Sequence, residues 1–214
     1  MRLRRIEEEW TRHIKANLGI YFFVVLLFLS GIVLGALAVR TLAIEQKTDL
    51  MDYLQIFVGD ISSEGLPTGN ELLAPTIWAN TKTALLLWLG GLTVVGLPLS
   101  LALVFTKGFS AGFTVAFLVD EVKWRGFILA IAAIFPHSLF SVPAVLFLAA
   151  GAVYFATGVL KHRFFKRQNH FESVVPFWNY SLFVLYAGLA MILASTVEAY
   201  ITPVLVKTTA AWLL

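Results

Sequence analysis

Residues 17–39 contain no charged side chain, and this stretch limits the possible folds more than any other feature of the sequence. An apolar helix needs about 20 residues to cross a hydrocarbon core of roughly 30 Å, so the stretch is long enough to span a membrane. It is too long and too rich in Phe for a cleavable signal segment. Across the whole chain 59% of residues are hydrophobic, 14% are charged and the mean hydropathy is +0.83. These values predict an integral membrane protein.

The distribution of charge predicts how the chain is oriented. Residues 1–16 carry five Lys and Arg residues, and a second basic cluster, KHRFFKR, covers residues 161–167. Segments rich in Lys and Arg stay in the cytoplasm, so we expect both segments inside, with 1–16 forming an amphipathic helix on the bilayer surface. Residues 41–76 carry six acidic side chains against Lys47 alone, so we expect them outside. Because the basic residues flank apolar stretches, the expected partner is the lipid bilayer and no nucleic acid.

The remaining apolar stretches set the predicted number of spans. We expect a second span at roughly residues 83–106, ending inside at Lys107, and a last span at 178–201. Between them the chain should cross twice, because both flanking basic segments lie inside. The total is about five transmembrane helices, N-in and C-out. The predicted fold class is an all-α, polytopic membrane helix bundle, one membrane domain over residues 1–214 with the bundle in 83–205.

Two prolines interrupt the longest apolar stretch in the segment FPHSLFSVP. About 35 apolar residues in one helix would extend roughly 52 Å, too long for one crossing. Pro136 and Pro143 each remove a helical N–H, so we expect a broken helix between them. His137 has two interpretations. It satisfies backbone groups freed by the prolines, which we favour, or it titrates near neutral pH.

The acidic outside segment is expected to contain a helix of its own. Apolar residues in 49–61 fall at helical spacing, with Thr48 as its N-cap, and the helix has an acidic polar face. Leu54 and Phe57 lie on its apolar face, which either packs on the other spans or binds an extracytoplasmic protein. A second outward element is a charged hairpin tip at 120–125, where Asp120 and Glu121 are further candidates for partner binding.

The segment GFSAG, from Gly108 to Gly112, has two interpretations. It matches the G-x-S-x-G pattern, so Ser110 with His137 as base could form the dyad of a rhomboid-like intramembrane serine protease. Small residues also allow close helix packing, which we favour because no strand precedes the pattern. The chain has no cysteine and no histidines at ligand spacing, so no metal site and no cofactor are expected.

Two segments carry a resemblance to a known family. The Gly-rich stretch WANTKTALLLWLGGLTVVGLPLSLALVFTKGFSAGF, which contains Asn80, and the later IFPHSLFSVPAVLFLAAGA are similar to the stage II sporulation protein M family. That family's pattern has an N-G-x-x-x-G turn and a P-H-G-x-x-E-x-P-A motif. The structural motif residues that match are Asn80, Gly108, Gly112, Pro136, His137 and Pro143.

The chain departs from the family pattern at three positions. Lys107 stands for the Asn of N-G, and Ser138 and Ser141 stand for the Gly and Glu of the P-H motif. Without that carboxylate, the structural interpretation of His137 is favoured.

The resemblance implies a non-enzymatic membrane scaffold of forespore engulfment. Such a scaffold sits in the septal membrane of a sporulating bacterium and recruits two peptidoglycan-degrading partners, the stage II sporulation proteins D and P. A different interpretation is a permease subunit of an ATP-driven exporter, since an amphipathic helix followed by several spans is similar to the membrane half of some exporters.

Overall fold

The computed structural model describes residues 17–63, 69–93, 96–164 and 177–210. In these ranges the regular elements are all helical: α2 (Leu18–Ala38), the short 3-10 helix η1 (Val39–Thr41), α3 (Ile44–Ser63), α4 (Gly69–Leu92), α5 (Gly96–Phe164) and α6 (Phe177–Ala210). The prediction of an all-α fold is confirmed. The helix expected in 1–16 and part of the second basic cluster lie outside the described residues.

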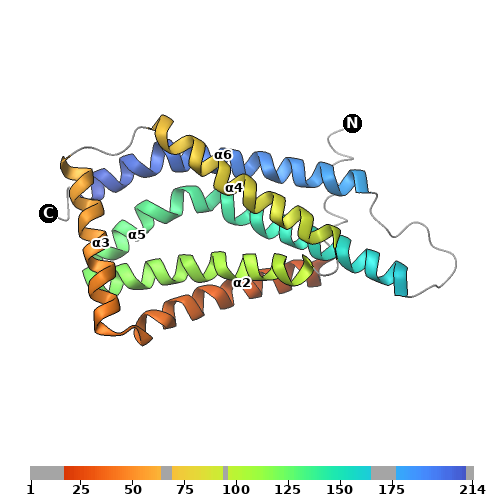
Figure 1. The fold of residues 1–214 in the computed structure, drawn as a ribbon, viewed down its shortest axis with the longest axis horizontal. Coiled ribbons are helices and arrows are strands. Elements are labelled where there is room, and N and C mark those ends of the chain that lie inside the picture. The colour runs from red at the N-terminus through yellow and green to blue at the C-terminus, as the bar shows by residue number, and fades with distance from the viewer. Residues whose placement is uncertain (1–16, 64–68, 94–95, 165–176, 211–214) are drawn as a thin grey trace.

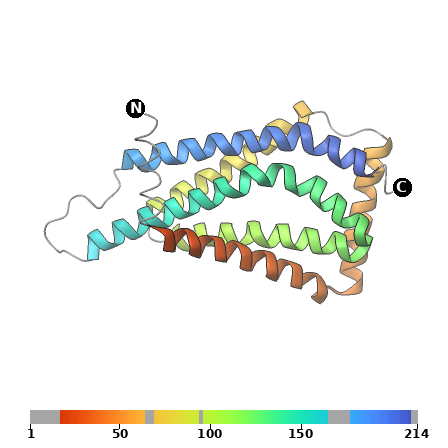
Figure 2. The same cartoon turned by 180° about the vertical axis from the view of Figure 1, so that it is seen from behind.

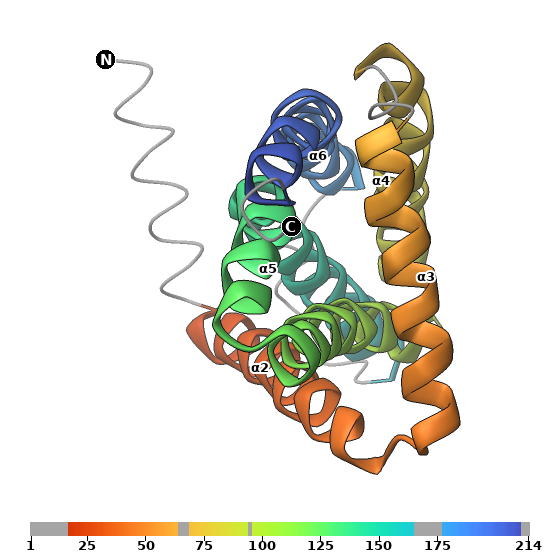
Figure 3. The same cartoon turned by 90° about the vertical axis from the view of Figure 1, so that its left-hand side faces the viewer.

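The long helices run lengthwise and α3 crosses one end of them. α2, α4, α6 and both arms of the folded α5 share one direction, whereas α3 is roughly perpendicular to it (Figures 1 and 3). α5 is central, because it contacts α2, α4 and α6. α2 begins at one end of the bundle, and α6 finishes at the other end, beside α3 (Figure 2). A chain that begins and finishes at opposite ends makes an odd number of passes.

Within the described ranges, three helices are long and apolar enough to cross a membrane: Leu18–Thr41, Gly96–Leu160 and Tyr180–Thr209. α4 runs beside them but carries Asn80 and Lys82, and it is not among the three. The count of five spans and the N-in, C-out orientation stay predictions. Apolar side chains of α2 point away from the bundle and are exposed, which suits a helix that faces lipid.

The second candidate span folds back on itself at Lys123. The backbone of Lys123 is non-helical, with φ 58° and ψ −133°. Its side-chain ammonium donates a hydrogen bond to the carbonyl of Asp120 at 2.8 Å. Gly126 lets the two arms close, because a Cβ at this position would overlap the carbonyl of Leu118. The predicted hairpin tip at 120–125 is therefore confirmed.

The predicted helix break between Pro136 and Pro143 is wrong. Both prolines lie inside the second arm of α5, whose backbone stays helical there. That arm is arched (Figure 1), as expected of a helix that contains proline. A proline frees one carbonyl and strains one turn, so a helix that is packed on its neighbours can bend without ending. The reversal instead occurs in the polar DEVKWR segment.

The predicted single span at 83–106 is also wrong, because a tight turn divides it into the end of α4 and the start of α5. The N–H of Gly96 donates to the carbonyl and to the hydroxyl of Thr93, both at 3.1 Å. A Cβ on Gly96 would lie 2.5 Å from the Cα of Gly90, so glycine permits this approach. Pro98 lies in the first turn of α5, where its missing N–H leaves no hydrogen bond unmade.

The position of this turn also changes the position of Lys107. We expected Lys107 at the cytoplasmic end of a span, but it lies about 16 Å along the first arm of α5 from Gly96 and inside the candidate span Gly96–Leu160. The basic residue that served as a cytoplasmic marker is therefore part of the bundle.

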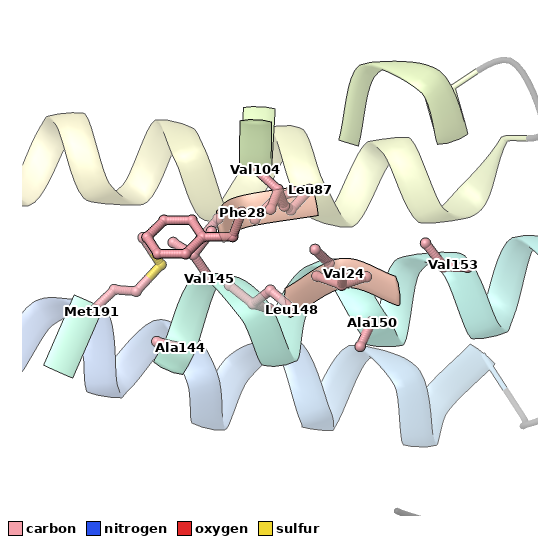
Figure 4. Packing of buried hydrophobic residues seen from close by; sticks show 12 residues of the cluster. Val24, Phe28, Leu87, Val104, Ala144, Val145, Leu148, Ala150, Val153 and Met191 are labelled. Carbon is pink, nitrogen blue, oxygen red and sulfur yellow. The ribbon is translucent and has the colours of Figure 1, made fainter. Parts of the chain in front are cut away.

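Two apolar clusters hold the helices together. The larger one, here called the central cluster, joins α2, α4, α5 and α6 (Figure 4) and includes Val24, Leu87, Val104, Leu148 and Met191. The smaller one, the end cluster, lies beside α3 and consists of Leu118, Leu129, Ala130 and Val206. Because lipid tails are as apolar as these side chains, the clusters stabilise the bundle mainly through close packing.

Candidate functional site

The first candidate site is the end of the bundle that α3 covers. The helix predicted at 49–61 is confirmed and extends over Ile44–Ser63, so Thr48 lies in its second turn instead of capping it. Leu54 is half-buried and packs against the end cluster, so this residue faces its own bundle. The side chain of Phe57 lies outside the described residues. Of the two candidate apolar residues on α3, Leu54 therefore serves packing.

An ion pair joins α3 to the hairpin tip. Lys47 Nζ donates to Asp120 Oδ2 at 2.5 Å and lies 4.0 Å from Glu121 Oε1. The hydrogen bond to Asp120 raises the pKa of Lys47 above its ordinary value, so the ammonium stays charged at neutral pH. Asp120 and Glu121, the acidic residues predicted to bind partners, therefore face Lys47 of the same chain. The sequence showed the charges but not that α3 reaches the tip.

The other face of α3 is left open. Tyr53 and Ile56 are 73% and 60% exposed, and Asp49 and Asp52 are exposed beside them. These four residues, here called the outer face of α3, combine an aromatic ring, an aliphatic side chain and two carboxylates on one helix. Aromatic side chains are enriched at protein interfaces, and this combination suits a partner with an apolar and basic surface.

Gly108 and Gly112 lie where α5 crosses α2. Carbon atoms added at Gly108 and Gly112 would overlap the carbonyl oxygens of Phe28 and Ile32, and a Cβ on Gly31 would lie 2.5 Å from the carbonyl oxygen of Phe105. The backbones of the two helices therefore touch. The packing interpretation of GFSAG is supported by this geometry.

The crossing pairs two G-x-x-x-G motifs. One is Gly108 to Gly112, and the other is Gly31 to Gly35 in α2. This spacing puts both glycines on one helix face and is a known signal for close contact between membrane helices. The signal of the second motif was present in the first span, but its partner could not be read from the sequence.

Ser110 and His137 form no dyad. Ser110 is exposed on the first arm, and its carbonyl accepts a hydrogen bond from Thr114 Oγ1. A nucleophile and its base must lie within hydrogen-bond reach, and the described residues show no hydrogen bond between these two side chains. The geometry therefore gives no support to a serine protease.

The remaining motif residues lie in a polar layer inside the bundle. Asn80 is 5% exposed, and its Nδ2 donates to Ser195 Oγ at 2.8 Å, which ties α4 to α6. His137 is half-buried on the second arm, one turn before the buried Ser141. Sequence reasoning missed Ser195 and also Glu198 of α6, which acts electrostatically on His137. Their signal was a polar pair, Ser195 and Glu198, three residues apart in an apolar span.

In the described part of the chain, no group of three His, Asp or Glu residues lies close enough together to hold a metal ion. Two arrangements of charge remain. Lys47 pairs with Asp120 at the α3 end, and Glu198 and Lys107 act electrostatically on His137. Both arrangements suit binding and packing.

Comparison with known protein families gives a match over most of the chain. No curated protein and no solved structure matches the chain. The sequence model described as Stage II sporulation protein M matches residues 24–203, from the middle of α2 to the later part of α6. The match therefore includes both G-x-x-x-G motifs, the whole of α5 and the polar layer. Because it covers far more than half of the chain, this membrane protein belongs to the Stage II sporulation protein M family.

Proposed function

We propose that this chain is a non-enzymatic scaffold of the sporulation engulfment complex. It recruits and stabilises peptidoglycan-degrading partners, the stage II sporulation proteins D and P, at the septal membrane during forespore engulfment. The observation that carries the proposal is the position of α3, which lies across one end of the bundle (Figure 3). The side chains of its outer face are exposed.

The outer face is suited to binding because α3 is held at two points. Leu54 packs on the end cluster, and Lys47 pairs with Asp120 on the hairpin tip. A surface that is already ordered loses less conformational entropy when a partner binds. The exposed Tyr53 and Ile56 can then serve as anchors of a small interface, because a few central apolar residues supply most of the binding energy.

The charge distribution supports placing this end in the wall space. Residues 41–76 are acidic, whereas the basic clusters are residues 1–16 and residues 161–167, which begin in the last turn of α5. Enzymes that degrade peptidoglycan act outside the cytoplasmic membrane, so a recruiting surface has to face the same side.

The test is co-purification of the two partners from sporulating membranes with variants of α3. The double variant Tyr53→Ala and Ile56→Ala removes both anchors, and each anchor of this kind is worth about 1–2 kcal/mol. We therefore expect at least about a tenfold loss of captured partner. Gln55→Ala, between the two anchors, is the matched control and should keep wild-type capture.

Three outcomes separate the alternatives. Undiminished capture by the double variant excludes the outer face of α3 as the recruiting surface. Absence of both partners from the wild-type eluate contradicts the scaffold. An ATPase in that eluate favours the permease subunit instead.

A further inference from the structure

A layer of ionisable side chains separates the two apolar clusters. Lys107 lies on the first arm of α5, His137 on the second arm and Glu198 on α6. On each of these three segments, the ionisable residue has the end cluster on one side along the chain and the central cluster on the other. The flanking pairs are Leu118 and Val104, Ala133 and Ala144, and Val206 and Met191.

The layer lies at one depth, inside the candidate spans. At 1.5 Å per residue, Lys107 is about 24 Å and His137 about 21 Å from the hairpin reversal at Lys123, on antiparallel arms. Both belong to the candidate span Gly96–Leu160, and Glu198 belongs to Tyr180–Thr209. The three residues therefore share a level along the bundle, where His137 and Glu198 are half-buried and Lys107 is exposed.

His137 is acted on by both charges. Burial of the ring disfavours a protonated imidazole, Glu198 favours it, and Lys107 adds to the effect of burial. The Nδ1 atom of His137 is buried and makes no hydrogen bond of standard geometry, although the carbonyl of Ile134 one turn earlier interacts with the ring. One imidazole nitrogen is therefore not held by a strong partner.

The other neighbouring helices add no charge at this position. α2 carries no Asp, Glu, Lys or Arg between residues 18 and 38. On α4, the ammonium of Lys82 lies 5.0 Å from the ring centroid of Trp78, and Asn80 is bonded to Ser195. On α3, Lys47 is paired at the hairpin tip. Among the described residues, Glu198 and Lys107 are therefore the charges that act on His137.

An ionisable residue inside a span is costly to insert, so such residues are rare and mark ion or proton sites. We propose that Lys107, His137 and Glu198 form an intramembrane proton-binding site, at which the imidazole of His137 binds the proton. The basic imidazole nitrogen accepts one proton from a hydronium ion: an N–H bond forms, one O–H bond of the hydronium breaks, and a water molecule is released.

The site adds a property that the scaffold function does not require. Partner recruitment depends on α3, about 20 Å away along the arms of α5, whereas proton binding depends on the layer between the clusters. Loss of one property therefore leaves the other testable.

The test is a histidine-resolved NMR titration of the full chain in lipid nanodiscs from about pH 4 to 9. His137→Gln identifies the signal among the four histidines. We expect the wild-type signal to titrate once in this range. Glu198→Gln should move its midpoint to lower pH and Lys107→Met to higher pH, each by about half a unit or more, roughly threefold in proton affinity.

Lys82→Met is the matched control, because it removes a lysine that does not act on His137, and its midpoint should equal that of the wild type. If Glu198→Gln or Lys107→Met does not fold, Glu198→Ala or Lys107→Gln removes the same charge and replaces it. A signal that does not titrate overturns the proposal. So does a midpoint that stays constant in both charge variants, or one that moves equally in the control.

Discussion

Gly112→Ala tests whether the crossing of α2 and α5 holds the bundle together. The new Cβ would overlap the carbonyl of Ile32, a backbone atom of α2 that cannot turn aside, so the two helices must separate. Inserting a methyl group into such a contact costs about 1–3 kcal/mol. The change from Gly to Ala also gains up to about 1 kcal/mol in helix propensity, which partly hides the clash.

Gly188→Ala separates these two effects. Gly188 also lies inside a candidate span, but a Cβ there meets nothing within 4 Å. The propensity gain is common to both variants, so the difference in their free energies of unfolding should equal the clash alone, about 1–3 kcal/mol. Reversible unfolding in mixed detergent micelles, followed by circular dichroism, measures this difference.

A second variant at the same crossing tests the geometry further. A Cβ on Gly35 would overlap the carbonyl of Phe109. Once α2 has moved away to accommodate one methyl group, the second should cost less, so the double variant Gly35→Ala and Gly112→Ala should be less than additive. Equal stability of Gly112→Ala and Gly188→Ala would refute the close contact, and strict additivity would refute the shared movement.

Three further predictions concern single contacts. Ser195→Ala leaves the buried amide of Asn80 without its acceptor and should lower the free energy of unfolding by about 1–2 kcal/mol; a wild-type value would contradict the bond between α4 and α6. Lys47→Asp should detach α3 from the tip, and adding Asp120→Lys should restore it. Disulfide trapping between introduced cysteines reports both results, since the chain has none of its own. The pair raises the pKa of Lys47 and lowers that of Asp120, so it is lost as pH rises past the raised value or falls past the lowered one. Trapping by the wild-type pair should therefore not vary across neutral pH; a loss between neutral pH and pH 8 argues against it. Lys123→Gly should stabilise the hairpin by about 1 kcal/mol, because glycine adopts a positive φ without strain; destabilisation would show that the bond from Lys123 to Asp120 matters more.

Much of the architecture could be predicted from single segments. Hydropathy summed over a window identified the uncharged α2 and the last span, and helical spacing identified α3. Two prolines marked the arm of α5 that is arched, but the prediction of a break there was wrong. The family pattern selected Asn80, Gly108 and His137, although it assigned none of them a partner.

The mean hydropathy of a sequence window gave a wrong span where a few residues decided the direction of the chain. The turn at Thr93 and Gly96 sits inside an apolar run, so hydropathy counted one span where the chain reverses. A reversal of this kind depends on hydrogen bonds and on the small size of glycine, and neither changes the mean hydropathy of a window. The error then moved Lys107 from the membrane surface into the bundle.

The sequence by itself determined which segments are apolar, how long they are and where the charges lie, because these are properties of each segment alone. The tertiary structure decided which segments meet: the two G-x-x-x-G motifs at one crossing, Asn80 with Ser195, Lys47 with Asp120, and Glu198 with His137. Such contacts join residues that are far apart in the chain. They depend on where the chain turns, and one misplaced turn changes all of them.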